Sequence, residues 1–333
     1  MKNRLLTSFL LLLTLIASTK VAFAHTPLKP DGENDSLENA LMIPDPTKSW
    51  TLYRELHEAG EVEYFRLELG AGERFYVSIY TPRNEEPEFS PSLVVMGPDI
   101  SAGPQPPEFV EVPPEYSATT LHVERPERPE YEPFTPASYY YLASFDMEAQ
   151  GDGVYYFAVF DPSHEGRYGV AVGYRETFTL IEWLLIPFDL VRIHQWEGQS
   201  LSLILAPLIL TLALGVVYTL MRLSGMMSPR GATGMTAGLL YIGTGLMTFM
   251  QMVFALSGAF SGSMVLTMVF VLLPIIFGAE LVRRSIKVMR TPGAAERGTF
   301  ILIGVLGLFT WSGFLLGPAL AAVTGLLPKG TNG

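Results

Sequence analysis

The residue whose position points most directly to chemistry is His25. It follows Ala22-Phe23-Ala24, a pattern typical of a signal-peptidase site, so cleavage there leaves His25 as the first residue of the mature chain. A terminal amine and the imidazole of the same residue form a two-nitrogen chelate that suits Cu(II). His57, His122 and His164 lie in the same predicted domain, but their spacing matches no local ligand motif. A copper site at His25 is therefore one hypothesis, and a terminal histidine without a ligand role is the alternative.

Carboxylates offer a second metal hypothesis. They alternate in residues 31–35 and cluster in residues 85–88. Calcium prefers such oxygen ligands, yet the chain has no EF-hand loop and no glycine-aspartate repeat. Acidic side chains on a solvated surface explain the same pattern. Calcium stays an alternative to which no ligands are assigned.

The sequence offers little support for catalysis. Because the chain has no cysteine, thiolate metal sites, iron–sulfur clusters and cysteine nucleophiles are excluded. The motifs H-E-x-x-H and G-x-S-x-G and a phosphate-binding P-loop are absent too. In the apolar C-terminal part, Gln251 is expected to hydrogen-bond between helices, and Glu280 to form an ion pair with Arg283 or Arg284. We therefore predict a protein that is not an enzyme, with no catalytic residue and no bound cofactor.

The overall composition is that of a membrane protein. Of the 333 residues, 49% are hydrophobic and only 17% are charged, which leaves too little polar surface for a soluble globule. Residues 25–199 hold 11 Lys and Arg against 31 Asp and Glu, whereas residues 200–333 hold 8 against 2. The chain thus divides into an acidic part and an apolar, mildly basic part. The net charge of −11 argues against nucleic acid as a partner.

The apolar part contains four stretches near or above the length of about 20 residues that a helix needs to cross a bilayer. They cover about residues 201–221, 235–256, 264–282 and 300–326, and a tail follows at 327–333. Basic residues gather in the loops after the first and third stretches, which the positive-inside rule places in the cytoplasm. The sequence predicts a bundle of four transmembrane helices in the plasma membrane, with the N-terminal domain and the C-terminus both extracytoplasmic.

The first 24 residues are predicted to be a cleaved signal peptide. They combine Lys2 and Arg4 with a short apolar run at residues 9–16 and end at the cleavage pattern before His25. An uncleaved signal anchor is the alternative, although Lys20 interrupts the apolar stretch.

Residues 177–199, which connect the two parts, mix aromatic and apolar side chains with a few charges. This mixture is typical of a short amphipathic helix that lies in the outer membrane interface. Pro187 is expected to kink or interrupt such a helix. A plain juxtamembrane linker is the alternative.

Residues 25–176 are predicted to form an all-β sandwich. Several short runs alternate between apolar and polar residues and are separated by Gly, Pro and Asp, which is typical of strands and turns. The runs at 64–69 and 75–80, joined by Gly70-Ala71-Gly72-Glu73, indicate a β-hairpin. Residues 98–136 hold ten prolines and eight acidic residues, so we expect an extended insertion with little regular pairing that contacts a partner or stays solvated.

The order of these segments resembles a known domain family. The series 35–40, 61–74 (EVEYFRLELGAGER), 91–98 (PSLVVMGP), 151–160 (GDGVYYFAVF) and 166–173 resembles the bacterial pre-peptidase C-terminal (PPC) domain and its GOLD-like relatives. The resemblance implies a jelly-roll-like sandwich that contacts proteins or carbohydrates, and it brings no catalytic residue. The membrane part and the insertion depart from the family pattern.

Together these patterns predict a membrane-anchored extracytoplasmic binding protein, acting as an accessory subunit of a membrane or cell-surface complex. Its expected partners are the lipid bilayer, a membrane or cell-surface protein, and a carbohydrate or metal ligand. A copper-handling protein that uses His25 is the first alternative. A small transporter or channel component is the second.

Overall fold

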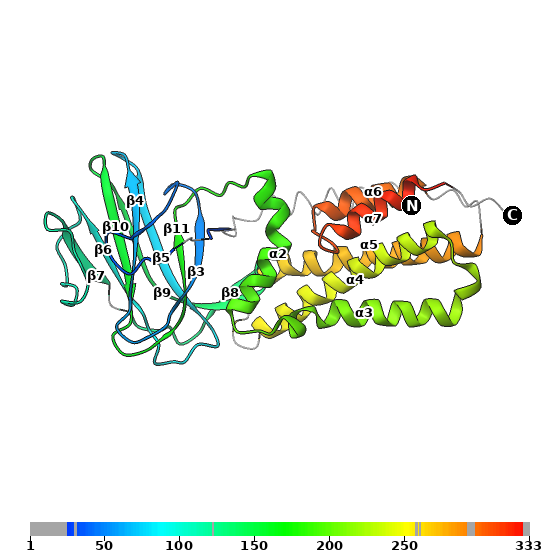
Figure 1. Ribbon diagram of the computed structural model, residues 1–333, viewed down its shortest axis with the longest axis horizontal. Helices are drawn as coiled ribbons and strands as arrows, with labels where there is room; N and C mark the ends of the chain where they lie inside the picture. Colours follow the sequence, from blue (N-terminus) through cyan, green and yellow to red (C-terminus); the bar gives the residue numbers. More distant parts are fainter. Residues whose placement is uncertain are drawn as a thin grey trace.

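Two β-sheets packed face to face form the N-terminal part of the chain, and a group of helices forms the remainder (Figure 1). The computed structural model describes residues 25–29, 32–121, 123–256, 259, 261–291 and 297–328. The predicted signal peptide, His122 and residues 329–333 of the predicted tail lie outside the described residues. The predicted combination of a β domain with a helical part is confirmed.

Within the described residues one sheet has six strands and the other five. The first sheet runs in the order β1 (Thr26–Pro27), β3 (Trp50–Leu56), β11 (Gly166–Val172), β5 (Arg74–Pro82), β9 (Ala137–Glu148) and β8 (Glu130–Glu132). The second runs in the order β2 (Leu41–Met42), β4 (Val62–Leu69), β10 (Gly153–Phe160), β6 (Ser92–Gly97) and β7 (Ser117–Leu121). Short β1 and β2 pair in parallel at the edges, and the other neighbours are antiparallel.

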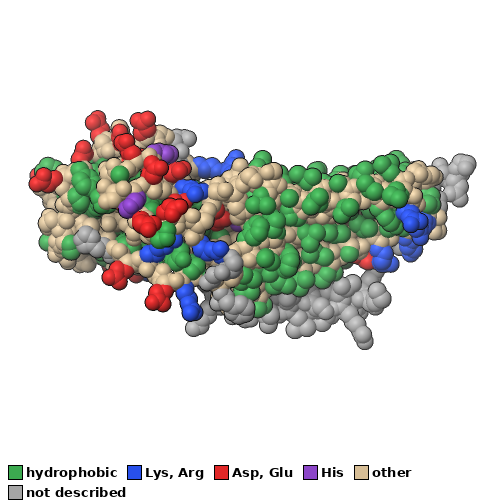
Figure 2. Space-filling model, turned by 90° about the horizontal axis from the view of Figure 1, so that it is seen from below, with side chains coloured by type: hydrophobic (Ala, Val, Ile, Leu, Met, Phe, Trp, Pro, Cys, Tyr) green, Lys and Arg blue, Asp and Glu red, His purple; other side chains and the backbone are tan. Residues whose placement is uncertain are grey.

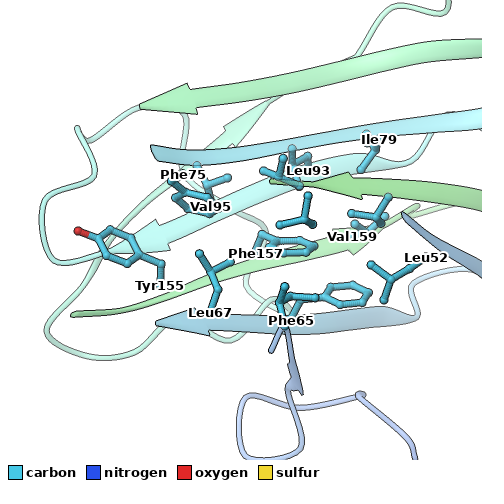
Figure 3. Close-up of a cluster of buried hydrophobic side chains, with 14 of the residues drawn as sticks. Leu52, Phe65, Leu67, Phe75, Ile79, Leu93, Val95, Tyr155, Phe157 and Val159 are labelled. Atoms are coloured by element: carbon cyan, nitrogen blue, oxygen red, sulfur yellow. The ribbon is translucent and has the colours of Figure 1, made fainter. Parts of the chain in front are cut away.

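Alternate residues of both sheets meet in an apolar core (Figure 3). Phe65 of β4 stacks on Phe157 of β10, with ring centroids 4.6 Å apart, and both side chains are fully buried. Phe75 reaches the same core from β5 and packs edge-on against Tyr155 at 5.6 Å. Each fully buried side chain of this size contributes about 1.5–3 kcal/mol of burial free energy, so the inward faces of the strands hold the sandwich together.

The predicted hairpin at residues 64–69 and 75–80 is wrong. The two runs form β4 and β5, but β4 belongs to one sheet and β5 to the other. The connecting turn crosses between the sheets, with Gly72 in the left-handed region (φ 81°) and the Glu73 carboxylate accepting from the Gly70 N–H at 2.8 Å. Alternation and a glycine turn are common to a hairpin and to this crossover. The pairing partners distinguish the two arrangements, because β4 pairs with β10, whereas β5 pairs with β9 and β11.

The proline-rich insertion is more regular than the sequence indicates. It contributes β7, which pairs with β6, and β8, which pairs with β9. Arg125, between these strands, donates to the carbonyls of Glu85 and Glu86 at 3.1 and 2.8 Å and lies over the Tyr140 ring at 4.1 Å. The expectation of little regular pairing in residues 98–136 is therefore wrong, because two strands of this segment pair with the sheets. One of them, β8, extends the first sheet toward the helices.

The helical part contains α3 (Leu201–Arg222), α4 (Pro229–Leu256) and α5 (Met264–Arg290), with a short 3-10 helix, η1 (Ser224–Met226), between α3 and α4. These three helices are long and apolar enough to cross a membrane. Figure 2 shows hydrophobic side chains over the surface of the helical part, acidic ones over the sandwich, and Lys and Arg at the far end. This distribution is consistent with association of the helices with a lipid bilayer.

The predicted fourth transmembrane helix at 300–326 is wrong. Residues 297–326 form two shorter helices, α6 (Arg297–Leu308) and α7 (Leu316–Leu326), that lie side by side as a hairpin (Figure 1). The chain reverses at residues 309–315, where Trp311, Gly313, Phe314 and Leu315 have positive φ. Arg297 donates to the carbonyl of Leu327 at 3.3 Å, so the two ends of the hairpin are neighbours. An apolar stretch specifies removal from water but not whether the chain crosses or returns.

Small residues bring α4 and α5 together. A Cβ atom placed on Gly238 would lie 2.7 Å from the carbonyl oxygen of Gly278, so neither position has room for a larger side chain. The predicted ion pair at Glu280 is also confirmed, with carboxylate distances of 2.7 Å to Arg283 and 2.6 Å to Arg284.

The hairpin predicts that the ends of α5 and α7 lie on the same side of the membrane. The cysteine-free chain accepts single cysteines at exposed Ser101 in the sandwich, Thr291 after α5 and Pro328 after α7. With three crossings, S101C should react with an impermeant maleimide on one side of the membrane, and T291C and P328C on the other. The unmodified chain is the zero-label control. Labelling of P328C together with S101C would contradict the hairpin and restore a fourth crossing.

Candidate functional site

Hydrogen bonds fix the sandwich on the end of α4 and the start of α5. Ser138 at the start of β9 donates to the carbonyl of Ala255 at 2.7 Å. Tyr131 of β8 shares a hydrogen bond of 2.7 Å with Thr267, whose hydroxyl also lies 2.8 Å from the carbonyl of Pro133. These contacts are buried, so water does not compete with them and the two parts are held in one arrangement.

A helix, α2 (Leu180–Trp196), lies between the sandwich and the other helices, across their direction (Figure 1). It begins with a capping box, in which Thr179 and Glu182 satisfy each other's backbone N–H groups, and Glu182 also pairs with Lys48 at 2.6 Å. Pro187 lies inside the helix without interrupting it. The helix expected at 177–199 is thus present, and its location in a membrane interface stays a prediction.

A buried polar cluster ties the end of α2 to the sandwich. Glu197 accepts from the Tyr139 hydroxyl at 2.7 Å and lies 2.8 Å from Nδ1 of His194. The backbone carbonyl of Glu197 accepts from Asn84. Trp196, the preceding residue, donates through its ring nitrogen to the carbonyl of Arg54 at 2.9 Å. The carboxylate and imidazole form a potential acid–base pair, but every contact described also serves to hold α2 in place.

A cavity of about 280 Å³ lies where the sandwich, α2 and the other helices meet. Its lining is mostly apolar and aromatic, with a few polar groups, which is the usual character of a small-ligand site. The sandwich contributes Thr51, Tyr53, Tyr80, Tyr139 and Tyr141, and the helical part contributes, among others, Trp183, Ile193, Met247, Phe270, Trp311 and Phe314.

The tip of the α6–α7 hairpin closes one side of this cavity. Trp311 donates from its ring nitrogen to the carbonyl of Trp183 at 2.9 Å and stacks on Phe270 at 5.7 Å. The N–H of Gly313 donates to Thr244 of α4 at 2.9 Å. The hairpin therefore ends in the wall of the site, and hydrogen bonds from the Trp311 side chain to α2 and from the Gly313 backbone to α4 hold its tip there.

Gln251 forms a hydrogen-bonded pair across the structure, but its partner lies in the connection before α3 and not, as the sequence predicts, in a second helix. Its side-chain amide and that of Gln199, just before α3, exchange two hydrogen bonds of 2.8 Å each. Gln251 lines the cavity at this point. The reciprocal amide pair satisfies polar groups that an apolar wall could not.

Glu132 is the acidic residue that the cavity shares with a second, more polar hollow of about 750 Å³. Its carboxylate accepts from the N–H of Phe134 at 3.1 Å. Burial, and then the negative charge of Glu176, raises the pKa of Glu132 to about 7. None of the ion pairs among the described residues includes Glu132. Near neutral pH, the site therefore holds a carboxylate that is costly to ionise.

His25 lies beside this carboxylate site and lines both hollows. Its Nδ1 is 2.5 Å from the Ser49 hydroxyl, and burial lowers its pKa to about 4, so the imidazole is neutral at pH 7. Within the described residues, no three His, Asp or Glu side chains are grouped as metal ligands. The copper and calcium hypotheses stay predictions without a ligand set. Of the other histidines, His164 lies 3.6 Å from Asp161.

Most of the cavity residues were not found from the sequence. Glu132 falls in the proline-rich insertion, and the tyrosines at 53, 80, 139 and 141 look like ordinary strand residues. The only available signal was a density of tyrosine in strands whose outward faces should otherwise be polar. Neither a protein-family model nor a curated protein matches the chain, so its function is inferred from its own side chains.

The pKa of Glu132 predicts a pH-dependent stability difference. The folded-state pKa of about 7 lies above the ordinary value of 4.5, so ionisation of Glu132 destabilises the fold progressively from pH 4.5 to pH 7. Glu132→Gln should raise the unfolding free energy by up to about 3 kcal/mol at pH 8 and leave it unchanged below about pH 4.5. Thermal unfolding in dodecyl maltoside, followed by circular dichroism, measures the difference. Glu148→Gln, at an exposed position far from the cavity, is the control. An effect of E132Q that does not change with pH would contradict the assignment.

The buried cluster at Glu197 predicts a second effect. Tyr139→Phe leaves one oxygen of a buried carboxylate without its donor, so the unfolding free energy should fall by about 1–3 kcal/mol. Tyr140→Phe, the next residue on the same strand, keeps its ring under Arg125 and should have little effect. Equal unfolding temperatures for the two variants would show that the Tyr139–Glu197 hydrogen bond does not stabilise the junction.

Proposed function

We propose that this protein is a membrane-anchored, non-enzymatic binding protein that holds a small, mainly apolar ligand between its extracytoplasmic sandwich and its membrane helices. The observation that carries the proposal is the cavity at the junction, lined by aromatic side chains and few polar groups. Rigid aromatic walls bury the surface of an apolar ligand with little loss of side-chain entropy.

The charge distribution supports an orientation in the membrane in which the sandwich lies outside. Apolar side chains cover the helices, and the basic residues Arg222, Arg283, Arg290 and Arg297 lie at the helix ends far from the acidic sandwich. By the positive-inside rule, this end faces the cytoplasm and the sandwich faces outward. In this orientation the end of α7 is on the cytoplasmic side, unlike the extracytoplasmic C-terminus expected with four crossings.

The PPC- or GOLD-like assignment is part of this proposal. The two packed sheets are what a sandwich of that type requires, although the crossover between β4 and β5 replaces the expected hairpin. In such a domain the exposed face of the sandwich is available to a membrane or cell-surface protein, or to a carbohydrate, as in an accessory subunit. Ligand in the junction cavity would then alter how firmly the sandwich is held on the helices.

The proposal predicts saturable binding of a neutral amphiphile. The bromine of 10-bromodecan-1-ol quenches nearby indole fluorescence, and Trp183 and Trp311 line the cavity. Titration of the full chain in dodecyl maltoside should show a saturable quenching component. Thr248→Phe, which fills the cavity from α4, should weaken this component by about tenfold or more, as expected when bulk occupies an apolar site.

Val253→Phe supplies the matched control. It adds a similar volume on the same helix, but on its exposed surface, so saturable quenching should persist. The melting temperature of each variant separates loss of binding from loss of folding. Quenching that never saturates, or that T248F and V253F affect equally, would reject ligand binding in the cavity.

A further inference from the structure

The sandwich side of the junction cavity is aromatic and acidic. Tyr80 packs against Tyr139 and Tyr141 with ring centroids 4.9 and 5.5 Å apart, and all three line the cavity with Glu132. The charge of Glu132 reaches the tyrosines, since burial, together with Glu132, raises the pKa of Tyr141. Tyrosine faces beside a carboxylate form the combination that binds organic cations in proteins.

The described lining of the cavity contains no Lys or Arg. The second acidic residue, Asp189, is already paired, with Lys29 at 3.0 Å and Arg192 at 3.2 Å. Glu132, in contrast, accepts one backbone N–H and takes part in no ion pair among the residues described. The cavity therefore has one carboxylate whose charge is not balanced from within the lining.

The space around Glu132 suits an amphipathic molecule. On one side is the apolar cavity of about 280 Å³, and on the other is the more polar hollow that contains Glu130 and Arg74. Arg74 is already paired with Asp146 at 2.6 Å and lies over the Tyr76 ring at 5.2 Å. The apolar cavity is at the small end of ligand sites, which favours a single alkyl or aryl group over a diacyl lipid.

We propose that the junction cavity binds a single-chain amphipathic amine, with its cationic nitrogen between Glu132 and the tyrosine faces and its apolar part among the aromatic residues of the helices. This inference rests on the proposed ligand-binding function and names the chemical class of the ligand. The cation replaces the missing countercharge of Glu132, and the tyrosines supply the negative faces that a desolvated ammonium group prefers.

The groups that face Glu132 determine how binding depends on pH. They are Glu130 on its own strand, Glu176 after β11, the tyrosines of β3, β5 and β9, and His25, with Asp189 and His194 of α2 in the same lining. His25 is neutral above pH 5 because burial lowers its pKa. An alkylamine, with a pKa near that of lysine, about 10.4, stays cationic throughout. The carboxylate of Glu132 is thus the group that should control amine affinity between pH 5 and pH 8.

The test compares 10-bromodecylamine with 10-bromodecan-1-ol, which differ only in the head group, by tryptophan quenching of the full chain in dodecyl maltoside. At pH 8 the amine should bind about tenfold to hundredfold more tightly than the alcohol. At pH 5, where Glu132 holds a proton, this preference should fall about tenfold or more. Glu132→Gln should remove the preference at pH 8 and leave alcohol binding within about twofold, whereas Glu148→Gln should keep it.

The outcomes separate the two proposals. If the alcohol shows no saturable binding, the proposed function fails and the inference fails with it. If amine and alcohol bind equally to the unmodified chain, the site is an apolar one and the inference alone is overturned. Loss of the preference for amine over alcohol as the pH falls tests the role of the Glu132 charge without any substitution. Displacement of the bound amine by didecanoyl phosphatidylethanolamine, but not by the phosphatidylglycerol equivalent, would overturn the single-chain limit and assign the amine to a membrane lipid.

Discussion

The structure depends on the hydrogen bonds at the start of β9. Ser138 and Tyr139 are adjacent, so their side chains point to opposite faces of the strand, and each contacts a different element of the helical part. Ser138 donates to the end of α4, and Tyr139 to Glu197 after α2. Both bonds are buried, so breaking either leaves a polar group without water or partner. The strand thereby fixes the distance between the sandwich and two helices, and that distance defines the cavity.

The cavity keeps features that work against stability. Glu132 is half-buried, lies near another carboxylate and forms no ion pair among the residues described. Such an arrangement raises the cost of ionisation, and perturbed carboxylates in hollows are characteristic of binding sites. A purely structural junction would be better served by an apolar side chain at this position. The presence of the acid in an otherwise apolar, tyrosine-rich wall is the reason for assigning the site to a cationic ligand.

The hairpin of α6 and α7 shows how irregular backbone can exist among apolar helices. Residues 309–315 leave the helical conformation, and free N–H and C=O groups there would be costly in hydrocarbon. The bond from Gly313 to Thr244 and the contact of Trp311 with Trp183 bury the reversal against α4 and α2. The same contacts make the hairpin tip a wall of the cavity. The half-length helices are therefore linked to α2 and, through it, to the sandwich.

The sequence by itself determined the division into an acidic β part and an apolar helical part, because alternation, apolar length and charge are local properties of the chain. It also identified the Glu280 ion pair, in which the partners are on adjacent turns of one helix. The tertiary structure decided the rest. Whether β4 pairs with β5 depends on strands that come much later, and the return of residues 300–326 accompanies contacts of the reversal with α4 and α2. The site was hidden for the same reason: Tyr80, Glu132 and Trp311 are far apart in the chain, and only packing of the sandwich on the helices gathers them around one cavity.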